Sequence, residues 1–207
     1  LTAWQLGPRL PARRTADRLW IVRQRCRTTF SPPKRITVRE MISQKLQEAI
    51  NEQIKFELYS AYMYLAMSAD CSDRNLTGFA NWLRMQAQEE VEHGMRFYDF
   101  LIERGGRVEL HGIDKPPFEF GSPLEIMEQS LEHERFVTSR INELFDLAHE
   151  EQDRPAQVML QWFITEQVEE EASIDEIIQR MKMFGADGAA LFMLDRDLGA
   201  RSPAADE

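Results

Sequence analysis

The sequence predicts an all-α protein: a bundle of four long helices with one long crossover between the second and third helices and a short fifth helix near the C-terminal end. Two observations support this fold class. Four stretches of similar length have apolar side chains three and four positions apart, the pattern of a helix with one buried face. The break within each pair of stretches is short and the break between the pairs is long, as in bundles with a single crossover. No strand pattern, repeat or glycine-rich phosphate loop in the sequence favours another class.

The first two helices are expected to form one pair. The first is predicted from Ile42 to about Asp70, and a polar break follows at residues 72–75. The second is predicted from Leu76 to Arg104, where a glycine pair begins. Glycine adopts the left-handed backbone that commonly ends a helix, so the long crossover should start at this point.

The third and fourth helices have clear start signals. Ser122-Pro123-Leu124-Glu125 combines an N-cap serine, a first-turn proline and a capping-box glutamate, which predicts a helix over residues 123–150. Asp153-Arg154-Pro155 repeats the cap-then-proline order, and this helix should reach Phe184. The apolar segment 189–194 is expected to form the short fifth helix, with frayed residues after it.

Charge divides the chain into two parts. The net charge is −10, yet residues 1–40 contain ten Lys and Arg side chains against two acidic ones. Residues 41–207 therefore have 15 basic and 33 acidic side chains, a net charge of −18, which attracts cations and repels nucleic acid. We interpret residues 1–40 as a basic, disordered arm and residues 41–207 as the helical domain.

Three interpretations of the arm stay open: a targeting peptide, a nucleic-acid-binding arm, or upstream sequence that is not native. We favour the last, because Met41 opens the periodic region. No apolar run reaches the roughly 20 residues that a membrane-spanning helix needs, so no membrane association is expected. Cys26 and Cys71 form no disulfide framework, which favours a reducing compartment, the cytoplasm.

Each long helix has polar residues on its apolar stripe, where leucine or valine would be expected. Burying an unpaired carboxylate costs several kcal/mol, roughly, so such a residue needs a cation. Carboxylates and a Glu-x-x-His pair in the middle of a bundle are how such proteins bind two iron or manganese ions. A ligand set of oxygens with one imidazole and no thiolate disfavours structural zinc. The polar residues are Glu57, Glu90, His93, Glu134, Gln167 and Glu170.

Further residues extend this candidate centre. Glu90 is the natural bridging carboxylate between two ions, and the absence of a second Glu-x-x-His predicts that the ions are bound unequally. A third cation site could form from Glu89, Glu166, Glu169 and Glu170, although such a cluster could also be a solvated face. Tyr64 could be a redox-active or hydrogen-bonding phenol, or simply a core residue.

Residues 41–207 resemble the non-haem ferritins of the prokaryotic type along their whole length. The resemblance rests on Asn51-Glu52-Gln53, Glu57-Leu58-Tyr59-Ser60, Gln86-Ala87-Gln88-Glu89-Glu90 with His93, Glu132-His133-Glu134, and Gln161-Trp162 followed by Glu166-Gln167-Val168-Glu169-Glu170-Glu171. It implies a ferritin-like bundle with a ferroxidase centre. The implied ligands are Glu57, Glu90 and His93 for the first iron, Glu90, Glu134 and Glu170 with Gln167 close by for the second, and Glu89, Glu166, Glu169 and Glu170 for the third. Tyr64 matches the family's tyrosine near this centre.

The resemblance also implies a function, iron storage and detoxification. Members of this family form hollow cages, usually of twenty-four copies, which oxidise Fe(II) with dioxygen or peroxide and store the ferric mineral. Haem is not expected, because Val91 and Ala172 stand where haem-binding relatives have a methionine and a histidine. Two alternatives stay open: a soluble di-iron oxidoreductase of the rubrerythrin kind, and a DNA-protecting mini-ferritin that would use the basic arm. Nucleic acid is otherwise not an expected partner.

Overall fold

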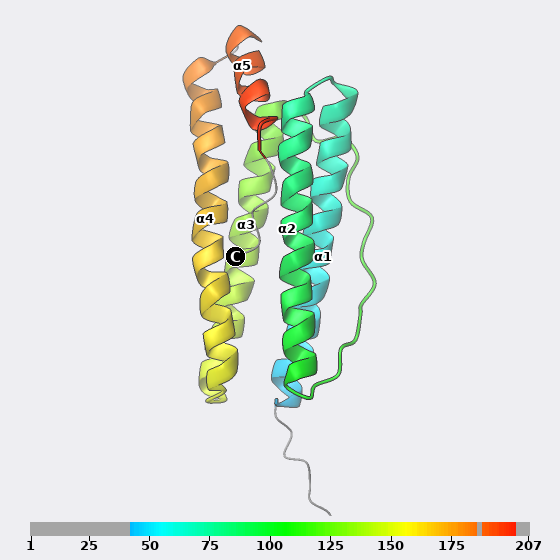
Figure 1. The fold of residues 1–207 in the computed structure, drawn as a ribbon, viewed down its shortest axis with the longest axis vertical. Helices are drawn as coiled ribbons and strands as arrows, with labels where there is room; N and C mark the ends of the chain where they lie inside the picture. Colours follow the sequence, from blue (N-terminus) through cyan, green and yellow to red (C-terminus); the bar gives the residue numbers. More distant parts are fainter. Residues whose placement is uncertain (1–41, 186–187, 202–207) are drawn as a thin grey trace, which may run out of the picture. The chain divides into compact units, whose positions relative to one another are not determined.

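The computed structural model describes residues 42–185 and 188–201, and the predicted arm over residues 1–40 lies outside them. The described residues form four long helices and one short helix, with no strand (Figure 1). The fold class predicted from the sequence is therefore confirmed. None of the helices in this part of the chain is long and apolar enough to cross a membrane. The helices are α1 (Gln44–Asp73), α2 (Thr77–Glu103), α3 (Pro123–Glu150), α4 (Arg154–Phe184) and α5 (Gly188–Leu198).

The predicted start and stop signals form as expected. Ser122 caps α3 in a full capping box with Glu125, and the Asp153 side chain accepts a hydrogen bond from the Ala156 N–H at the start of α4. Gly105, just past α2, has a φ of 68°, the left-handed backbone that suits glycine. These local caps satisfy backbone groups that a helix end leaves unpaired, which explains why the boundaries could be read from the sequence.

The long crossover between α2 and α3 runs beside α1 (Figure 1). Asn51 on α1 fixes it with two hydrogen bonds: its Nδ2 donates to the Arg107 carbonyl at 3.0 Å, and its Oδ1 accepts from the Glu109 N–H at 2.9 Å. The connection therefore returns the chain to the other end of the bundle, so that α3 and α4 form the second helix pair.

The buried apolar side chains form two clusters, one at each end of the bundle. One cluster contains Tyr64, Phe79, Ile126 and Ile174 among others, and the other contains Ile50, Phe97, Ile141 and Phe163 among others. On every long helix, the predicted polar residues fall between the members of the two clusters. The bundle thus has a buried polar layer with an apolar cluster on each side.

Helix α5 is longer than the sequence predicted, because a tertiary contact extends it beyond Leu194 to Leu198. The buried Asp195 accepts hydrogen bonds from the Gly78 and Phe79 N–H groups at 2.9 and 3.0 Å. These N–H groups lie in the first turn of α2, where the N-cap residue Leu76 makes no side-chain hydrogen bond. Asp195 therefore supplies from α5 the cap that α2 lacks.

Gly78 permits this contact, and we predict that Gly78→Ala destabilises the protein by about 2 kcal/mol or more. A Cβ at this position would lie 1.5 Å from the Asp195 carbonyl oxygen, which belongs to the backbone and can move only with α5. Thermal unfolding measures the effect. Gly112→Ala in the crossover is the matched control, because a Cβ there meets nothing within 4 Å. Equal unfolding temperatures for the two variants would contradict the packing of α5 on α2.

Candidate metal centre

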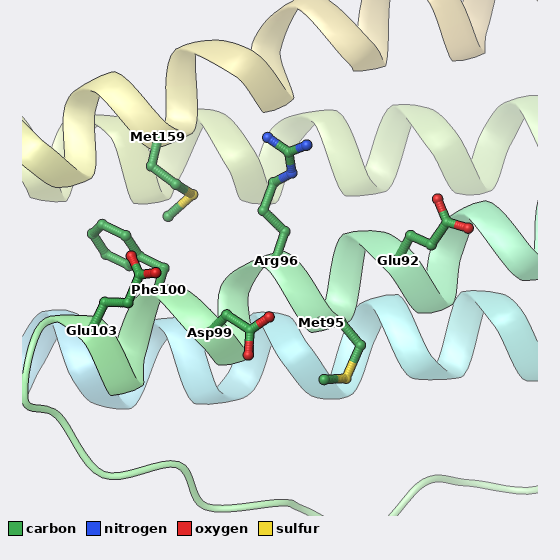
Figure 2. Close-up of a pocket in the computed structure, with 7 residues that line it drawn as sticks. All are labelled: Glu92, Met95, Arg96, Asp99, Phe100, Glu103 and Met159. Carbon is green, nitrogen blue, oxygen red and sulfur yellow. The ribbon is translucent and has the colours of Figure 1, made fainter. Parts of the chain in front are cut away.

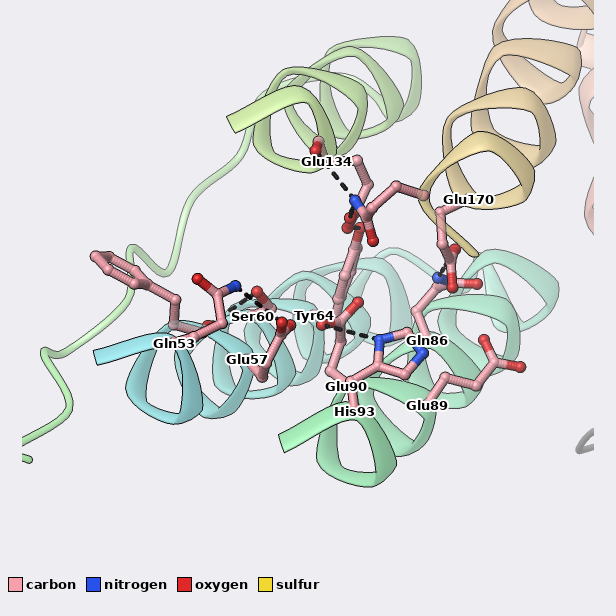
Figure 3. A network of polar contacts seen from close by, with 12 residues as sticks. Gln53, Glu57, Ser60, Tyr64, Gln86, Glu89, Glu90, His93, Glu134 and Glu170 are labelled. Atoms are coloured by element: carbon pink, nitrogen blue, oxygen red, sulfur yellow. Dashed lines mark hydrogen bonds and ion pairs between the residues drawn. The ribbon is translucent and has the colours of Figure 1, made fainter. Parts of the chain in front are cut away.

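Three predicted ligands come together in the middle of the bundle. Glu57 on α1 and Glu90 and His93 on α2 each offer one ligand atom, and these atoms all lie within 4.8 Å of one another. Glu57 and Glu90 are 1% exposed and His93 is 5% exposed. Figure 3 shows the three side chains pointing toward one another from the two helices. The helical spacing of Glu90 and His93, three residues apart, places both on the same face.

The carboxylates of this group have oxygens without partners. Glu57 Oε1 accepts a hydrogen bond from Gln53 Nε2 at 2.9 Å, but Glu57 Oε2 and both oxygens of Glu90 are buried with no hydrogen-bond partner. Buried polar atoms are almost always hydrogen-bonded in folded proteins. Unpaired carboxylate oxygens beside an imidazole are the donor set that a hard divalent or trivalent cation takes. The residues present therefore fit a metal ion.

Glu134 and Glu170 face this group from α3 and α4. The Tyr64 hydroxyl donates to Glu134 Oε1, and Gln167 Nε2 donates to Glu134 Oε2 at 3.1 Å. Gln86 Nε2 donates to Glu170 Oε2 at 2.6 Å. Both carboxylates lie outside the tight group of three, and Figure 3 shows them on the side of the centre formed by the other two helices. In the metal-free protein, neighbouring donors thus orient both side chains.

Burial sets the protonation of these residues. Desolvation raises the pKa of Glu57 to about 7 and, with the charge of Glu134, that of Glu170 to about 8. Desolvation, followed by the charges of Glu134, Glu57 and Glu170, raises the pKa of Glu90 well above its usual value. The pKa of His93 falls to about 4, first through burial and then through the charge of Arg96. His93 is therefore neutral near pH 7, as a metal-binding imidazole must be.

The predicted third site is less complete. Glu89 is half-buried and forms an ion pair with Arg201 at 2.7 Å. Burial, then the charges of Glu169 and Glu89, raises the pKa of Glu166, so the three carboxylates lie near one another, although Glu169 is exposed. Within the residues that the structure describes, these carboxylates do not form a compact metal-ligand group as Glu57, Glu90 and His93 do. The third site stays a prediction.

Sequence reasoning missed several residues that support the centre. Gln53 lies four positions before Glu57, and Gln86 lies four positions before Glu90 on the same stripe. An amide one helical turn before a buried carboxylate could have indicated a supporting donor. His133 Nε2 lies 2.7 Å from Ser60 Oγ, next to the tyrosine side of the centre. Arg201 gave no signal, because its contacts are with α2, far away in the sequence.

Aromatic rings cover the outer side of His93, and an acidic groove lies beside Arg96. Trp162 and Phe163 pack edge-on against the imidazole, and the Arg96 guanidinium lies 3.6 Å from the Trp162 ring centre. Figure 2 shows Arg96 reaching from α2 toward α4, with carboxylates on the same face of α2. The groove is lined by Glu92, Met95, Arg96, Asp99, Phe100, Glu103 and Met159. Its three carboxylates give the surface next to the centre an affinity for cations.

Comparisons with known proteins agree on one family. The family model described as a ferritin-like domain matches residues 47–184. A bacterial non-heme ferritin of Bacteroides fragilis is 43% identical over 161 residues, 78% of this chain and 100% of the relative. One from Staphylococcus saprophyticus is 40% identical over 162 residues, 78% of this chain and 97% of the relative. The structure of an open pore ferritin from the archaeon Archaeoglobus fulgidus has a TM-score of 0.78 and 47% identity, covering 79% of this chain and 99% of that one.

Proposed function

Because this chain belongs to the ferritin family, we propose that it is an iron-storage and detoxification protein that oxidises Fe(II) at the centre described above. One observation supports the oxidation site most directly: the buried Glu90 carboxylate, which lacks any hydrogen-bond partner and faces Glu57 and His93. An uncompensated carboxylate in a bundle core is costly unless a cation binds it. In this proposal, that cation is iron, the substrate, bound in the buried polar layer.

Two Fe(II) ions are bound side by side in this proposal. Glu57, Glu90 and His93 bind the first, and Glu90, Glu134 and Glu170 bind the second, with Gln167 next to Glu134. Glu90 is the shared ligand in this proposal because neither of its oxygens has a hydrogen-bond partner, its Oε2 lies 3.9 Å from His93 Nδ1, and the charges of Glu57, Glu134 and Glu170 act on it. A carboxylate bridge brings two ions close enough to act on one oxidant.

The reaction takes one electron from each of two Fe(II) ions. Dioxygen accepts the two electrons and two protons to give hydrogen peroxide, or peroxide itself serves as the oxidant and gives water. Hydrolysis of Fe(III) to the ferric oxyhydroxide mineral then releases protons. Carboxylate ligands favour this direction, because the harder Fe(III) prefers oxygen donors. Tyr64 and Gln86 orient Glu134 and Glu170 for binding, which limits the rearrangement needed when the metals enter.

We further propose self-assembly into a hollow cage of twenty-four copies, located in the cytoplasm. The surface of α1 and of the crossover exposes large apolar side chains, including Tyr62, Leu65, Ile113 and Phe118. Apolar patches of this kind mark protein–protein contacts. The acidic composition of residues 41–207 would concentrate Fe(II) at such a cage. Haem and nucleic acid have no part in this proposal.

Iron loading tests the function. The metal-free protein is given Fe(II) without oxygen, air is admitted, and near-ultraviolet absorbance follows oxidation before size-exclusion chromatography. We expect many irons per chain eluting with a particle much larger than the monomer. About two irons per chain, fast turnover and no retained mineral would instead indicate a di-iron oxidoreductase. A gel shift that depends on residues 1–40 would indicate the DNA-protecting alternative.

A further inference from the structure

Helix α5 and the residues that follow it contact α2 at successive positions that approach the metal centre. Asp195 caps the first turn of α2. One turn further along α2, Asn81 Nδ2 donates to the Arg201 carbonyl at 3.0 Å, and the Arg201 guanidinium lies 4.9 Å from the Trp82 ring centre. These contacts follow α2 in sequence order. They deliver the Arg201 side chain to the level of the buried polar layer.

The Arg201 guanidinium binds two residues next to the proposed irons. Its Nη2 donates to both oxygens of Glu89, at 3.0 and 2.7 Å, and its Nη1 donates to Gln86 Oε1. Gln86 in turn donates through Nε2 to Glu170 at 2.6 Å. Arg201 and Glu89 are both mostly buried, with side chains 26% and 20% exposed. A hydrogen-bonded chain thus links the C-terminal segment to a ligand proposed for the second iron.

We propose that Arg201 is a tethered cation that occupies the place of a third metal ion at Glu89, so that metal binding there releases the C-terminal segment from α2. This inference rests on the proposed function, since it concerns the third cation position beside the iron pair. Whether the residues around Arg201 are attached to α2 would then depend on whether a metal ion is bound at Glu89.

The geometry of Glu89 makes Arg201 and a metal ion compete for its carboxylate. Both of its oxygens accept from one guanidinium, a charge-assisted arrangement that leaves no oxygen free of the arginine. A metal ion that uses Glu89 with Glu166 or Glu170 competes with Arg201, because both oxygens of Glu89 already accept from the guanidinium and a second cation placed there repels the first. The coupling is reciprocal: if bound Arg201 lowers the affinity of Glu89 for the metal ion, the bound metal ion lowers the affinity of Glu89 for Arg201 by the same factor.

The same contact orients Gln86. With its Oε1 accepting from Arg201, the amide presents its NH₂ group to Glu170. Release of Arg201 removes this constraint on the amide. Displacement at Glu89 therefore also loosens the hydrogen bond on Glu170, and the third position is coupled to the second iron.

Zn²⁺, which cannot be oxidised, tests the competition separately from iron chemistry. Calorimetric titration of the metal-free protein is compared with that of Arg201→Gln, and we expect the weakest Zn²⁺ site to become about fivefold tighter or more in the variant. Arg180→Gln is the matched control. It removes a 2.8 Å ion pair between Arg180 on α4 and Asp197 on α5, so it loosens the same helix without touching Glu89, and its Zn²⁺ affinities should equal those of the unaltered protein.

Limited trypsin digestion tests the release. Cleavage after Arg201, followed by mass spectrometry, should speed up when Zn²⁺ is added to the unaltered protein. In Glu89→Gln it should be fast with or without Zn²⁺, because Arg201 has lost its carboxylate. The proposal requires both the tighter site and the faster cleavage, and the failure of either overturns it. A protein that stores iron normally but fails these tests keeps its proposed function, whereas both tests can succeed even if iron is not retained.

Discussion

Replacing Glu90 with alanine is expected to slow the initial oxidation of Fe(II) by about 100-fold or more, because it removes the carboxylate shared by both proposed irons. The other proposed ligands come from different helices: Glu57 and His93 from α1 and α2, and Glu134 and Glu170 from α3 and α4. Without a bridge, two Fe(II) ions lose the fixed proximity that allows one oxidant to take two electrons. Stopped-flow absorbance at about two Fe(II) per chain measures this rate.

Glu92→Ala is the matched control for this prediction. Glu92 lies two residues further along α2, is exposed, and lines the outer groove instead of the centre, so its loss should leave the initial rate nearly unchanged. Glu90→Gln adds a readout without oxidation. It keeps the side-chain volume and replaces a carboxyl group whose pKa is raised by burial with a neutral amide, so the metal-free variant should unfold at a higher temperature while binding Zn²⁺ more weakly. A normal oxidation rate in Glu90→Ala would show that the irons react elsewhere.

The fold could be predicted because its determinants are local. Ser122 and Asp153 mark helix starts through hydrogen bonds to residues three positions away, and the buried stripes of α1 to α4 follow the helical period. The C-terminal end of α5 could not be predicted, because Asp195 is paired with Gly78 and Phe79, more than a hundred positions away in the sequence. An aspartate after Leu194 looks like a solvated residue until that contact is known.

The candidate centre was predictable for a related reason. Glu57, Glu90 and Glu134 interrupt apolar stripes, so the sequence itself shows that buried charges need a partner. Their roles as iron ligands stay predictions, although the structure places them around one polar layer. Arg201 could not be found this way. It follows a helix whose end was expected to fray, and its partners on α2 are 112 and 115 positions away. Only folding shows that this arginine lies beside Glu89.

The stability of the metal-free protein is expected to fall as the pH rises from 6.5 to 8. A carboxyl group with a raised pKa binds its proton more tightly in the folded state than in the unfolded state, so its contribution to stability is lost as the pH passes through the folded pKa. Those pKa values are about 7 for Glu57 and about 8 for Glu170, and that of Glu90 is raised well above its usual value.

The two buried histidines act in the opposite sense. Burial lowers the pKa of His133 to about 4, and burial with the charge of Arg96 does the same for His93. Their neutral folded forms gain stability as the pH rises from 4 to 6.5 and change nothing above it. They offset the carboxylates at lower pH, so the fall should be steepest above pH 6.5.

A carboxyl group that keeps its proton in the folded state after the unfolded state has lost it costs about 1.4 kcal/mol per pH unit. Glu57 does so up to about pH 7 and Glu170 up to about pH 8, so these two together give a loss on the order of 3 kcal/mol between pH 6.5 and 8. Denaturant unfolding at pH 6.5, 7, 7.5 and 8 measures it. Zn²⁺ should remove most of the dependence, because the bound metal replaces the protons that the carboxylates lose. Glu57→Gln should reduce the pH dependence of the free energy of unfolding by the part that Glu57 contributes, and Glu92→Gln should leave this dependence unchanged. A metal-free profile that is flat or rises over this range would mean that the carboxylates are already neutralised by other groups, and the case for a cation in the polar layer would fail with it.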